Sequence, residues 1–376
     1  MHILIAPNAF KNSLTAHEAA KAIREGLERS RLVCSCTTFP IADGGDGTAA
    51  LLTHRADGTL LSCNVQDPLG RKVDASWGLI DQGQTAVIEM AEASGMRLLA
   101  KEELNPLKAS SFGTGEMILK ALSNNVRRII VSMGGSATVD AGTGILRALG
   151  VRFLSATGES ILDLPEDLSR VARVDVSGLD PRILHTEIIV LSDVTNPLLG
   201  PAGSAQAFGP QKGATSEDLF ILEASLMAFV DALPPYVRAY IGAMKYGGAA
   251  GGAAAGLHAI LGAKLQSGAD FFLKATDFDS ALRRADLVIT GEGSLDHQTL
   301  QGKGPLGVGL RAKMRGLPVV GLAGRIPKEV VPELREFFDV LLTIGAAGVE
   351  LAEALKSTYA DLRRTAEEVG NLLALV

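Results

Sequence analysis

The sequence predicts an α/β fold in which mostly parallel strands alternate with helices, as in doubly wound Rossmann- or flavodoxin-like sheets. Short β-branched apolar runs recur along the 376 residues, and helical hydrophobic patterns follow several of them. Each run ends in glycine, asparagine, aspartate or lysine. Because the carboxyl ends of parallel strands meet at one edge of such a sheet, we expect a large ligand site there. The runs are 3–6, 37–41, 129–133, 188–191, 287–290, 319–322 and 340–344.

Length and pattern both predict two domains. A chain of 376 residues is long for a single hydrophobic core. From about residue 58 to 90 the pattern changes to alternating, strand-like segments, and the strand–helix pattern returns near the end of the chain. We therefore expect a discontinuous, doubly wound α/β domain of residues 1–60 and 275–376. A second α/β domain, residues 61–274, is expected to be inserted in it.

The composition argues against several classes of function. The chain is 47% hydrophobic and 21% charged, as in ordinary globular proteins, and its net charge of −6 disfavours a nucleic acid or an anionic membrane as partner. Cys34, Cys36 and Cys63 form neither a redox nor a zinc motif. The first residues lack the basic start and long apolar run of a signal peptide, so we expect a cytoplasmic protein.

The first loop contains two candidate binding residues. Residues 3–6 predict a strand and residues 13–30 an amphipathic helix, with Asn8 and Lys11 between them. A lysine at a strand end can neutralise a phosphate or a carboxylate. The alternative for Lys11 is an ordinary surface lysine.

The second strand leads into a loop that holds Asp43 and a second aspartate. Gly45, Gly47 and Ala50 formally match a dinucleotide-binding fingerprint. Two carboxylates would repel a pyrophosphate, whereas they suit magnesium. We therefore favour a metal- or hydroxyl-binding role for this loop and keep an NAD-dependent oxidoreductase as an alternative function.

Two glycine-rich segments of the middle region are candidates for phosphate binding. Gly113 and Thr114 lie at a predicted helix start, where free N–H groups and the helix dipole favour anions. The strand at 129–133 ends in a turn of small residues that includes Asp140. The alternative is a plain turn in which Asp140 only caps the helix. The expected phosphate contacts in this turn are Gly134, Gly135, Ser136 and Thr138.

The next strand, 188–191, is followed by a carboxylate, an amide and an ammonium group. Asp193 and Asn196 come directly after the strand, and Lys212 lies in the following structured loop. A long helix at about 216–233 and a Gly/Ala-rich helix within 246–263 are predicted before the chain returns to the first domain.

The segment 285–303 has the richest set of polar residues. A buried strand at 287–290 breaks into a glycine-containing loop, and glycine lets a backbone approach a ligand closely. The alternative is a βα turn with a solvated acidic cap. The polar and glycine residues of this loop are Gly291, Glu292, Gly293, Asp296, Gln298 and Lys303.

Taken together, these loops resemble the bacterial glycerate kinase family, of the glycerate 2-kinase type. The resemblance implies transfer of the γ-phosphoryl group of ATP, with Mg²⁺, onto D-glycerate, usually at the 2-hydroxyl to give 2-phosphoglycerate. It also implies two α/β domains, one inserted into the other, with the active site in the cleft between them. Separately, we expect a monomer or a homodimer. The matching segments are ADGGDGT, IEMAEASG, SSFGTGE, GGSATVDAG, SDVTNPL, FGPQKGA, AAGG and GEGSLDHQTLQGK.

The sequence departs from the family pattern at a few positions. The family usually has aspartate and serine where this chain has Asn8 and Ala9, and commonly arginine at Ser294. Val139 and Ala141 also replace the family's common Asn and Gly. The changes at Asn8 and Ser294 leave a second alternative open, a non-catalytic regulator that binds a sugar acid on the same scaffold.

The resemblance and the chemistry of the loops together assign roles to the candidates. Glu292 and Asp296 are expected to hold Mg²⁺, with Asp43 as a further candidate. Asp193 is the preferred catalytic base, with Asp140 as the alternative, and Lys11 is a third catalytic candidate. The expected substrate-binding residues are Asn8, Asp43, Asn196, Lys212, Gln298 and Lys303. The expected nucleotide- and phosphate-binding residues are Gly113, Thr114, Gly134, Gly135, Ser136, Thr138, Gly291 and Gly293.

Overall fold

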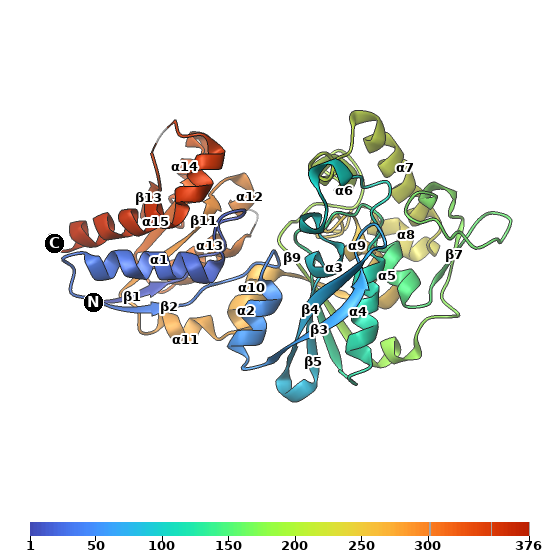
Figure 1. Ribbon diagram of the computed structural model, residues 1–376, viewed down its shortest axis with the longest axis horizontal. Coiled ribbons are helices and arrows are strands. Elements are labelled where there is room, and N and C mark those ends of the chain that lie inside the picture. Colours follow the sequence, from blue (N-terminus) through green and yellow to red (C-terminus); the bar gives the residue numbers. More distant parts are fainter. Residues whose placement is uncertain (301, 347, 376) are drawn as a thin grey trace. The chain divides into compact units, whose positions relative to one another are not determined.

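The computed structural model describes residues 1–300, 302–346 and 348–375 and has the α/β architecture predicted from the sequence (Figure 1). The chain forms two compact units. Unit 1 comprises Met1–Asp43 and Gly268–Val376, and unit 2 comprises Gly44–Ser267. The unit borders therefore lie at 43/44 and 267/268, whereas the sequence pattern predicts domain borders at 60/61 and 274/275.

Packing explains where these borders lie. The first helix after residue 43, α2 (Thr48–Arg55), packs on three strands of unit 2. Strand β3 (Thr59–Gln66) pairs along its whole length with β4 (Lys72–Ile80). At the other border, α10 (Gly268–Ala275) packs on a helix of unit 1. The alternating pattern that begins near residue 58 therefore does not mark the border between the two units, which lies at 43/44.

Unit 1 is built on a five-stranded sheet in the order β13-β12-β11-β1-β2. Every pairing in this sheet is parallel, as predicted, so its strands end at the same edge. The central strand, β11, comes from the C-terminal segment of the chain and pairs with β1 from the N-terminal segment. The strands are β1 (His2–Ile5), β2 (Ser35–Thr38), β11 (Leu287–Ser294), β12 (Val319–Arg325) and β13 (Val340–Thr343).

Helices α1 (Ala16–Arg29) and α15 (Leu351–Leu373) lie side by side against this sheet (Figure 1). Helix α1 begins with a capping box between Thr15 and Glu18. At Gly26 the two helices approach so closely that a Cβ atom would lie 2.2 Å from the carbonyl oxygen of Arg363. The other helices of unit 1 are α10, α11 (Phe278–Leu282), α12 (His297–Leu300), α13 (Gly304–Lys313) and α14 (Val331–Leu334).

Unit 2 contains a six-stranded mixed sheet in the order β10-β9-β6-β5-β4-β3. Its β3–β4–β5 part is antiparallel, in agreement with the alternating pattern of residues 58–90, and the remaining pairings are parallel. The four parallel strands therefore end at one edge. They are β5 (Thr85–Glu89), β6 (Arg128–Ser132), β9 (Glu187–Ser192) and β10 (Lys264–Ser267), and a separate pair is formed by β7 (Arg152–Leu154) and β8 (Arg173–Asp175).

The Gly/Ala-rich segment of unit 2 forms the helix α9 (Ala253–Leu261), which lies within the predicted range of residues 246–263. It follows a turn in which Gly251 and Gly252 have φ values of +67° and +87°. A Cβ atom at Gly256 would lie 1.8 Å from the carbonyl oxygen of Ala141, so small residues let α9 pack on the turn after β6. The other helices of unit 2 are α2, α3 (Ala91–Ser94), α4 (Phe112–Leu122), α5 (Thr143–Ala148), α6 (Ser204–Phe208), α7 (Ser216–Asp231) and α8 (Pro235–Ile241).

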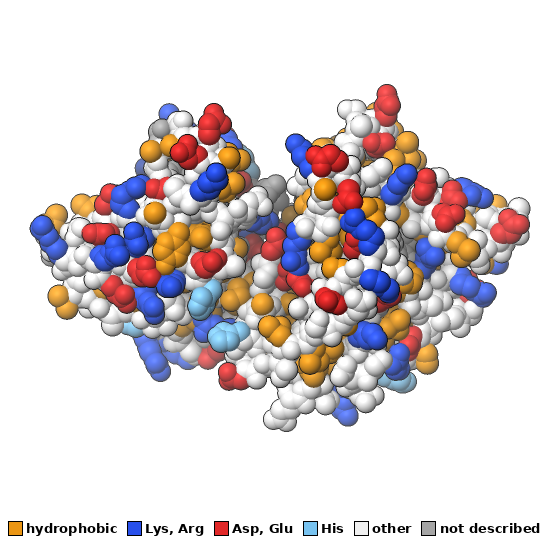
Figure 2. Space-filling model, viewed as in Figure 1, with side chains coloured by type: hydrophobic (Ala, Val, Ile, Leu, Met, Phe, Trp, Pro, Cys, Tyr) orange, Lys and Arg blue, Asp and Glu red, His pale blue; other side chains and the backbone are white. Residues whose placement is uncertain are grey.

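The two units have separate hydrophobic cores. The core of unit 1 joins the sheet to α1 and α15, and the core of unit 2 surrounds its sheet and includes the buried Trp77. On the visible face of each unit, acidic and basic side chains are interspersed (Figure 2). None of the helices in the described part of the chain has both the length and the apolar character needed to span a membrane.

Candidate active site

The polar cluster of unit 1 is centred on Glu292 in β11. Its side chain is only 5% exposed. The hydroxyl of Thr299, itself buried in α12, donates a hydrogen bond to Glu292 Oε1 at 2.8 Å. The same hydroxyl accepts a bond from the backbone N–H of Asp296 at 3.1 Å. Thr299 therefore ties the two predicted metal ligands to one short helix.

Three charged side chains affect the pKa of Glu292 in addition to its burial. Burial raises the pKa of Glu292 to about 7, and the negative charge of Asp43 acts in the same direction. The positive charges of Lys303 and Lys11 lower this pKa. Two carboxylates and two ammonium groups, from three separate segments of the chain, thus influence each other at the carboxyl end of the unit 1 sheet.

Asn8 holds Asp43 in place. Its side-chain amide donates to Asp43 Oδ2 at 2.8 Å, and its Oδ1 accepts a bond from the backbone N–H of Ala9 at 2.9 Å. The backbone N–H of Asn8 donates to the carbonyl of Gly291 at 2.8 Å. The amide thus orients the Asp43 carboxylate where an aspartate at position 8 would repel it.

The donor chemistry of this cluster fits magnesium. Mg²⁺ prefers oxygen ligands and is commonly held by one or two carboxylates together with substrate phosphates. A divalent cation would also relieve the repulsion between Glu292 and Asp43. Within residues 1–300, 302–346 and 348–375, however, there is no group of three or more His, Cys, Asp or Glu side chains that could hold a metal ion. The cluster therefore fits a cation that is held partly by these carboxylates and partly by substrate phosphates.

Other residues of the 285–303 loop have more varied surroundings. The Asp296 carboxylate is half-buried and accepts a bond from the Ser294 hydroxyl at 3.0 Å. Lys303 is buried at the start of α13. Gly293 is half-buried, whereas Gly291 is packed so tightly that a Cβ atom would lie 1.9 Å from the carbonyl oxygen of Leu322. The side chain of Gln298 lies outside the described part of the structure.

In unit 2, Asp140 is completely buried and its oxygens are occupied. Oδ2 accepts bonds from the backbone N–H and the hydroxyl of Ser111, at 3.0 and 2.6 Å, and from the N–H of Gly144 at 3.3 Å. Oδ1 accepts a bond from the N–H of Gly142 at 2.9 Å. Burial raises the pKa of Asp140, and these bonds lower it. This geometry fits a carboxylate that shapes the turn, which is the alternative reading of this position.

Lys212 is buried beside the same turn and is only 2% exposed. Its ammonium group donates to the Ser136 hydroxyl at 3.0 Å and to the carbonyl of Thr138 at 2.7 Å. Burial lowers the pKa of Lys212 to about 7, and the charge of Asp140 acts in the opposite direction. The structure thus brings Lys212 together with two predicted phosphate contacts.

The turn that follows β6 packs on the loop at the start of unit 2. The N–H of Gly134 donates to the carbonyl of Gly44 at 3.0 Å, and a Cβ atom at Gly134 would lie 2.4 Å from Gly45 Cα. Gly135 has a φ of +72°. The glycines are thus required by close backbone packing. Gly134 and Gly135 are half-buried, while Thr138 is fully buried.

Gly113 and Thr114 lie inside the packed first turn of α4. A Cβ atom at Gly113 would lie 1.8 Å from the carbonyl oxygen of Gln66. The Thr114 hydroxyl is buried and lies 2.7 Å from the Ser94 hydroxyl. This geometry fits a role of both residues in the packing of α4, and phosphate binding by either one stays a prediction.

Asp193 directly follows β9 and is half-buried at the carboxyl edge of the unit 2 sheet. Asn196 is half-buried too, and its amide donates to the carbonyl of Ala202 at 2.8 Å, which closes the loop after β9. Of these two, Asp193 has the position expected for a residue that meets a substrate.

Glu89 is a buried residue to which the pattern analysis gave no role. Its carboxylate accepts bonds from the N–H of Gly47, at 3.0 and 3.1 Å, and of Ala49, at 3.3 Å. These are N–H groups that a dinucleotide fingerprint would offer to a pyrophosphate. A carboxylate occupies this helix start, which argues against the NAD-binding alternative. The lone signal in the sequence was a glutamate at the end of a buried strand.

Comparisons with known proteins agree on one family. Residues 3–374 match the profile of the Glycerate kinase family. The chain is 41% identical to a glycerate kinase of Bacillus subtilis (strain 168), over 100% of this chain and 98% of the relative. It is 38% identical to the glycerate 2-kinase of Escherichia coli (strain K12), with the same two coverages.

A solved structure has the same fold. The crystal structure of a protein assigned as glycerate kinase 2 from Salmonella typhimurium LT2 matches with a TM-score of 0.82 at 39% identity. The match covers 100% of this chain and 98% of that one. On this similarity, which extends over the whole length, the chain is an enzyme and belongs to the glycerate kinase family.

Proposed function

We propose that this enzyme transfers the γ-phosphoryl group of ATP to the 2-hydroxyl of D-glycerate, with Mg²⁺, and so forms 2-phosphoglycerate. The observation that carries the proposal is the buried Glu292 carboxylate, which lies within the influence of Asp43, Lys11 and Lys303 at the carboxyl edge of the unit 1 sheet. Family membership and the glycerate 2-kinase of Escherichia coli support the acceptor and its 2-position.

Phosphoryl transfer depends mainly on positioning and on charge neutralisation. In this proposal Glu292 and Asp296 would hold Mg²⁺, with Asp43 as a further ligand, and the ion would supply positive charge to the substrate phosphates. Thr299 orients Glu292, and Asn8 orients Asp43. Lys11 and Lys303 bind anionic oxygens of the substrates in unit 1.

In unit 2 we assign the proton-accepting role to Asp193. Its position directly after β9 supports this choice. Asp140 accepts two hydrogen bonds from its own turn and two from Ser111 at the start of α4, so we assign it a positioning role for the Gly134–Thr138 segment and Lys212. An anion bound beside Lys212 would stabilise the ammonium form of this lysine, whose pKa burial lowers to about 7.

The decisive experiment measures ADP release from ATP and Mg²⁺ in the presence and absence of D-glycerate. The product is identified by phosphorus NMR, because its coupling pattern distinguishes the 2- from the 3-phosphate. Turnover that requires glycerate and yields 2-phosphoglycerate is expected. The 3-phosphate would overturn the assignment of the carbon, and turnover with another hydroxy acid alone would overturn the acceptor. Glycerate binding without turnover of ATP would favour the non-catalytic regulator.

A further inference from the structure

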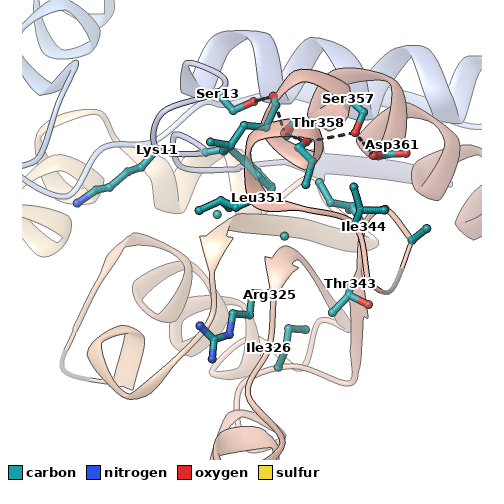
Figure 3. A pocket seen from close by; sticks show the side chains of 18 of the residues that line it. Lys11, Ser13, Arg325, Ile326, Thr343, Ile344, Leu351, Ser357, Thr358 and Asp361 are labelled. Carbon is teal, nitrogen blue, oxygen red and sulfur yellow. Dashed lines mark hydrogen bonds between the residues drawn. The ribbon is translucent and has the colours of Figure 1, made fainter.

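Unit 1 contains a pocket of about 560 Å³ (Figure 3). Among the residues that line it, only Lys11 and Gly293 were predicted above to bind a substrate or a nucleotide. This volume lies within the range of roughly 300–1,000 Å³ that is typical of small-molecule sites. The pocket is lined by residues that follow or end β1, β11, β12 and β13, and by the first turns of α15. It thus lies at the carboxyl ends of four parallel strands, where open α/β sheets bind ligands.

The middle of the pocket is apolar. Ile344 and Leu351 lie between its two sides in Figure 3, and Phe10, Ile326 and Leu355 add further apolar surface. A planar, weakly hydrated ring system gains from burial against such side chains. This region therefore fits a nucleobase better than a small hydrophilic acid.

The two ends of the pocket differ in charge. In Figure 3 Lys11 lies at the left of the pocket and Arg325 lies below it, whereas Ser357 and Asp361 lie at its upper right. Asp361 accepts a bond from the Ser357 hydroxyl at 2.7 Å and pairs with Arg364 at 2.7 Å. A carboxylate has about four acceptor sites, so these two bonds leave capacity for hydroxyl donors such as those of a ribose.

The basic end has the chemistry of a phosphate site. The guanidinium of Arg325 is exposed at the end of β12 and has no ion-pair or hydrogen-bond partner among residues 1–300, 302–346 and 348–375. Guanidinium groups bind phosphates through paired N–H donors. Lys11 lines the same pocket and also lowers the pKa of Glu292, so the pocket adjoins the carboxylate cluster.

We propose that this pocket binds the nucleoside part of the phosphate donor ATP. The base occupies the apolar middle, the ribose hydroxyls bond to Asp361, and the phosphate chain extends along Lys11 and Arg325 toward Glu292. Gly293, which follows Glu292 directly in β11, lines the pocket and provides this continuity. The inference rests on the proposed function for the identity of the donor, and it adds a site for the nucleoside.

The first test fills the apolar middle. Ala354 lines the pocket from α15, whereas Ala352 is exposed on the same helix. We expect Ala354→Phe to raise the KM for ATP by more than about tenfold and to leave the KM for D-glycerate unchanged. Ala352→Phe is the matched control and should behave as the wild type. Calorimetric binding of inorganic tripolyphosphate should be equal in the wild type and Ala354→Phe, because this anion lacks the nucleoside.

The second test addresses the polar ends. Asp361→Asn should weaken ADP binding by about 10- to 100-fold, the loss expected for hydrogen bonds to a charged group, without weakening tripolyphosphate binding. Arg325→Ala should weaken the binding of both ligands. Arg335→Ala removes an exposed arginine outside the pocket and is the control.

The outcomes separate this inference from the proposed function. If the wild type phosphorylates glycerate with ATP, but Ala354→Phe and Asp361→Asn keep the wild-type affinity for ATP and ADP, the pocket assignment is overturned and the proposed function stands. If the wild type binds ADP and Ala354→Phe blocks this binding, but no glycerate is phosphorylated, the pocket assignment stands and the proposed function falls.

Discussion

At the scale of single residues, the site contains ionisable side chains that are buried, and burial disfavours their charged form. Glu292 and Lys212 are both almost fully buried, and burial moves the pKa of each toward 7 from opposite sides. Such shifts are frequent at functional sites, because burial and nearby charges are arranged there for binding and proton transfer.

Glu292 should make the stability of the metal-free protein depend on pH. Its folded pKa of about 7 lies above its unfolded value, so its contribution is fully present below about pH 4.5 and is lost as the pH rises through 7. Glu292→Gln removes this titration. In urea unfolding with EDTA, we expect the variant to gain on the order of 3 kcal/mol relative to the wild type between pH 5 and 8.

Glu187→Gln provides the control for this experiment. Hydrogen bonds from Lys264 and Arg128 hold the pKa of Glu187 below its usual value, so the sign of its pH dependence is opposite. Its stabilising contribution is present at neutral pH and is lost as the pH falls through the folded pKa. A constant difference between the wild type and Glu292→Gln across this pH range would contradict the burial argument.

Asp193 and Asp140 should respond differently to the same chemical change. We expect Asp193→Asn to lower kcat by about two to four orders of magnitude while the free energy of unfolding stays close to that of the wild type. Asp140→Asn should instead lower the free energy of unfolding, because an amide has one acceptor oxygen for the four donors, which are two groups of Ser111 and the N–H groups of Gly142 and Gly144.

The measurements for this pair are steady-state kinetics and urea denaturation. Asp231→Asn, at the exposed end of α7, is the control for the loss of one carboxylate. A near-normal kcat for Asp193→Asn in a folded protein would remove Asp193 from the role of base.

At the scale of elements, backbone proximity explains residues that a motif search assigns to binding. Gly113 and Gly291 allow another backbone carbonyl within 2 Å of where a Cβ atom would lie, and Gly134 packs against the loop at Gly45. A glycine at the end of a strand can therefore serve either ligand binding or close backbone packing. Only the element that packs against it distinguishes these two roles.

The contact between α1 and α15 allows a direct test of such packing. Gly26→Ala places a methyl group 2.2 Å from the carbonyl oxygen of Arg363 and 2.7 Å from Ala366 Cβ. We expect a loss of about 1–3 kcal/mol in the free energy of unfolding, although alanine is the better helix former. His17→Ala, at an exposed position of α1, should change stability by less than about 0.5 kcal/mol. A stabilised Gly26→Ala would show that the two helices can separate at little cost.

At the scale of the whole molecule, the order of segments in the chain determines which unit can fold alone. Unit 2 is one continuous segment, Gly44–Ser267, and all residues of its core lie within it. Unit 1 is discontinuous, since β1 from the N-terminal segment pairs with β11.

We therefore expect a fragment of residues 44–267 to unfold cooperatively in urea, as followed by circular dichroism. A fragment of residues 268–376 should lack a cooperative transition, because β11 loses β1 and α15 loses α1. A non-cooperative transition of the 44–267 fragment would show that its core needs support from unit 1.

Much of the fold could be predicted from the sequence because the relevant patterns are local. A β-branched run such as 287–290 identifies a buried strand, and alternation in residues 58–90 identifies antiparallel strands. The borders of the units could not be predicted in this way. Helix α2 belongs to unit 2 because of the strands it packs on, and no pattern within Thr48–Arg55 encodes that choice.

For the candidate site too, some features follow from local sequence patterns and others only from the packing of distant segments. By itself the sequence determined the α/β class, the order of the polar loops and the family to which they belong, because strand periodicity and motifs are properties of short segments. Only the tertiary structure decided that Asn8 bonds to Asp43, that Glu89 occupies the start of α2 and that Glu292 is buried. Burial and hydrogen-bond partners arise when distant strands such as β1 and β11 pair, and their spacing along the chain does not specify them.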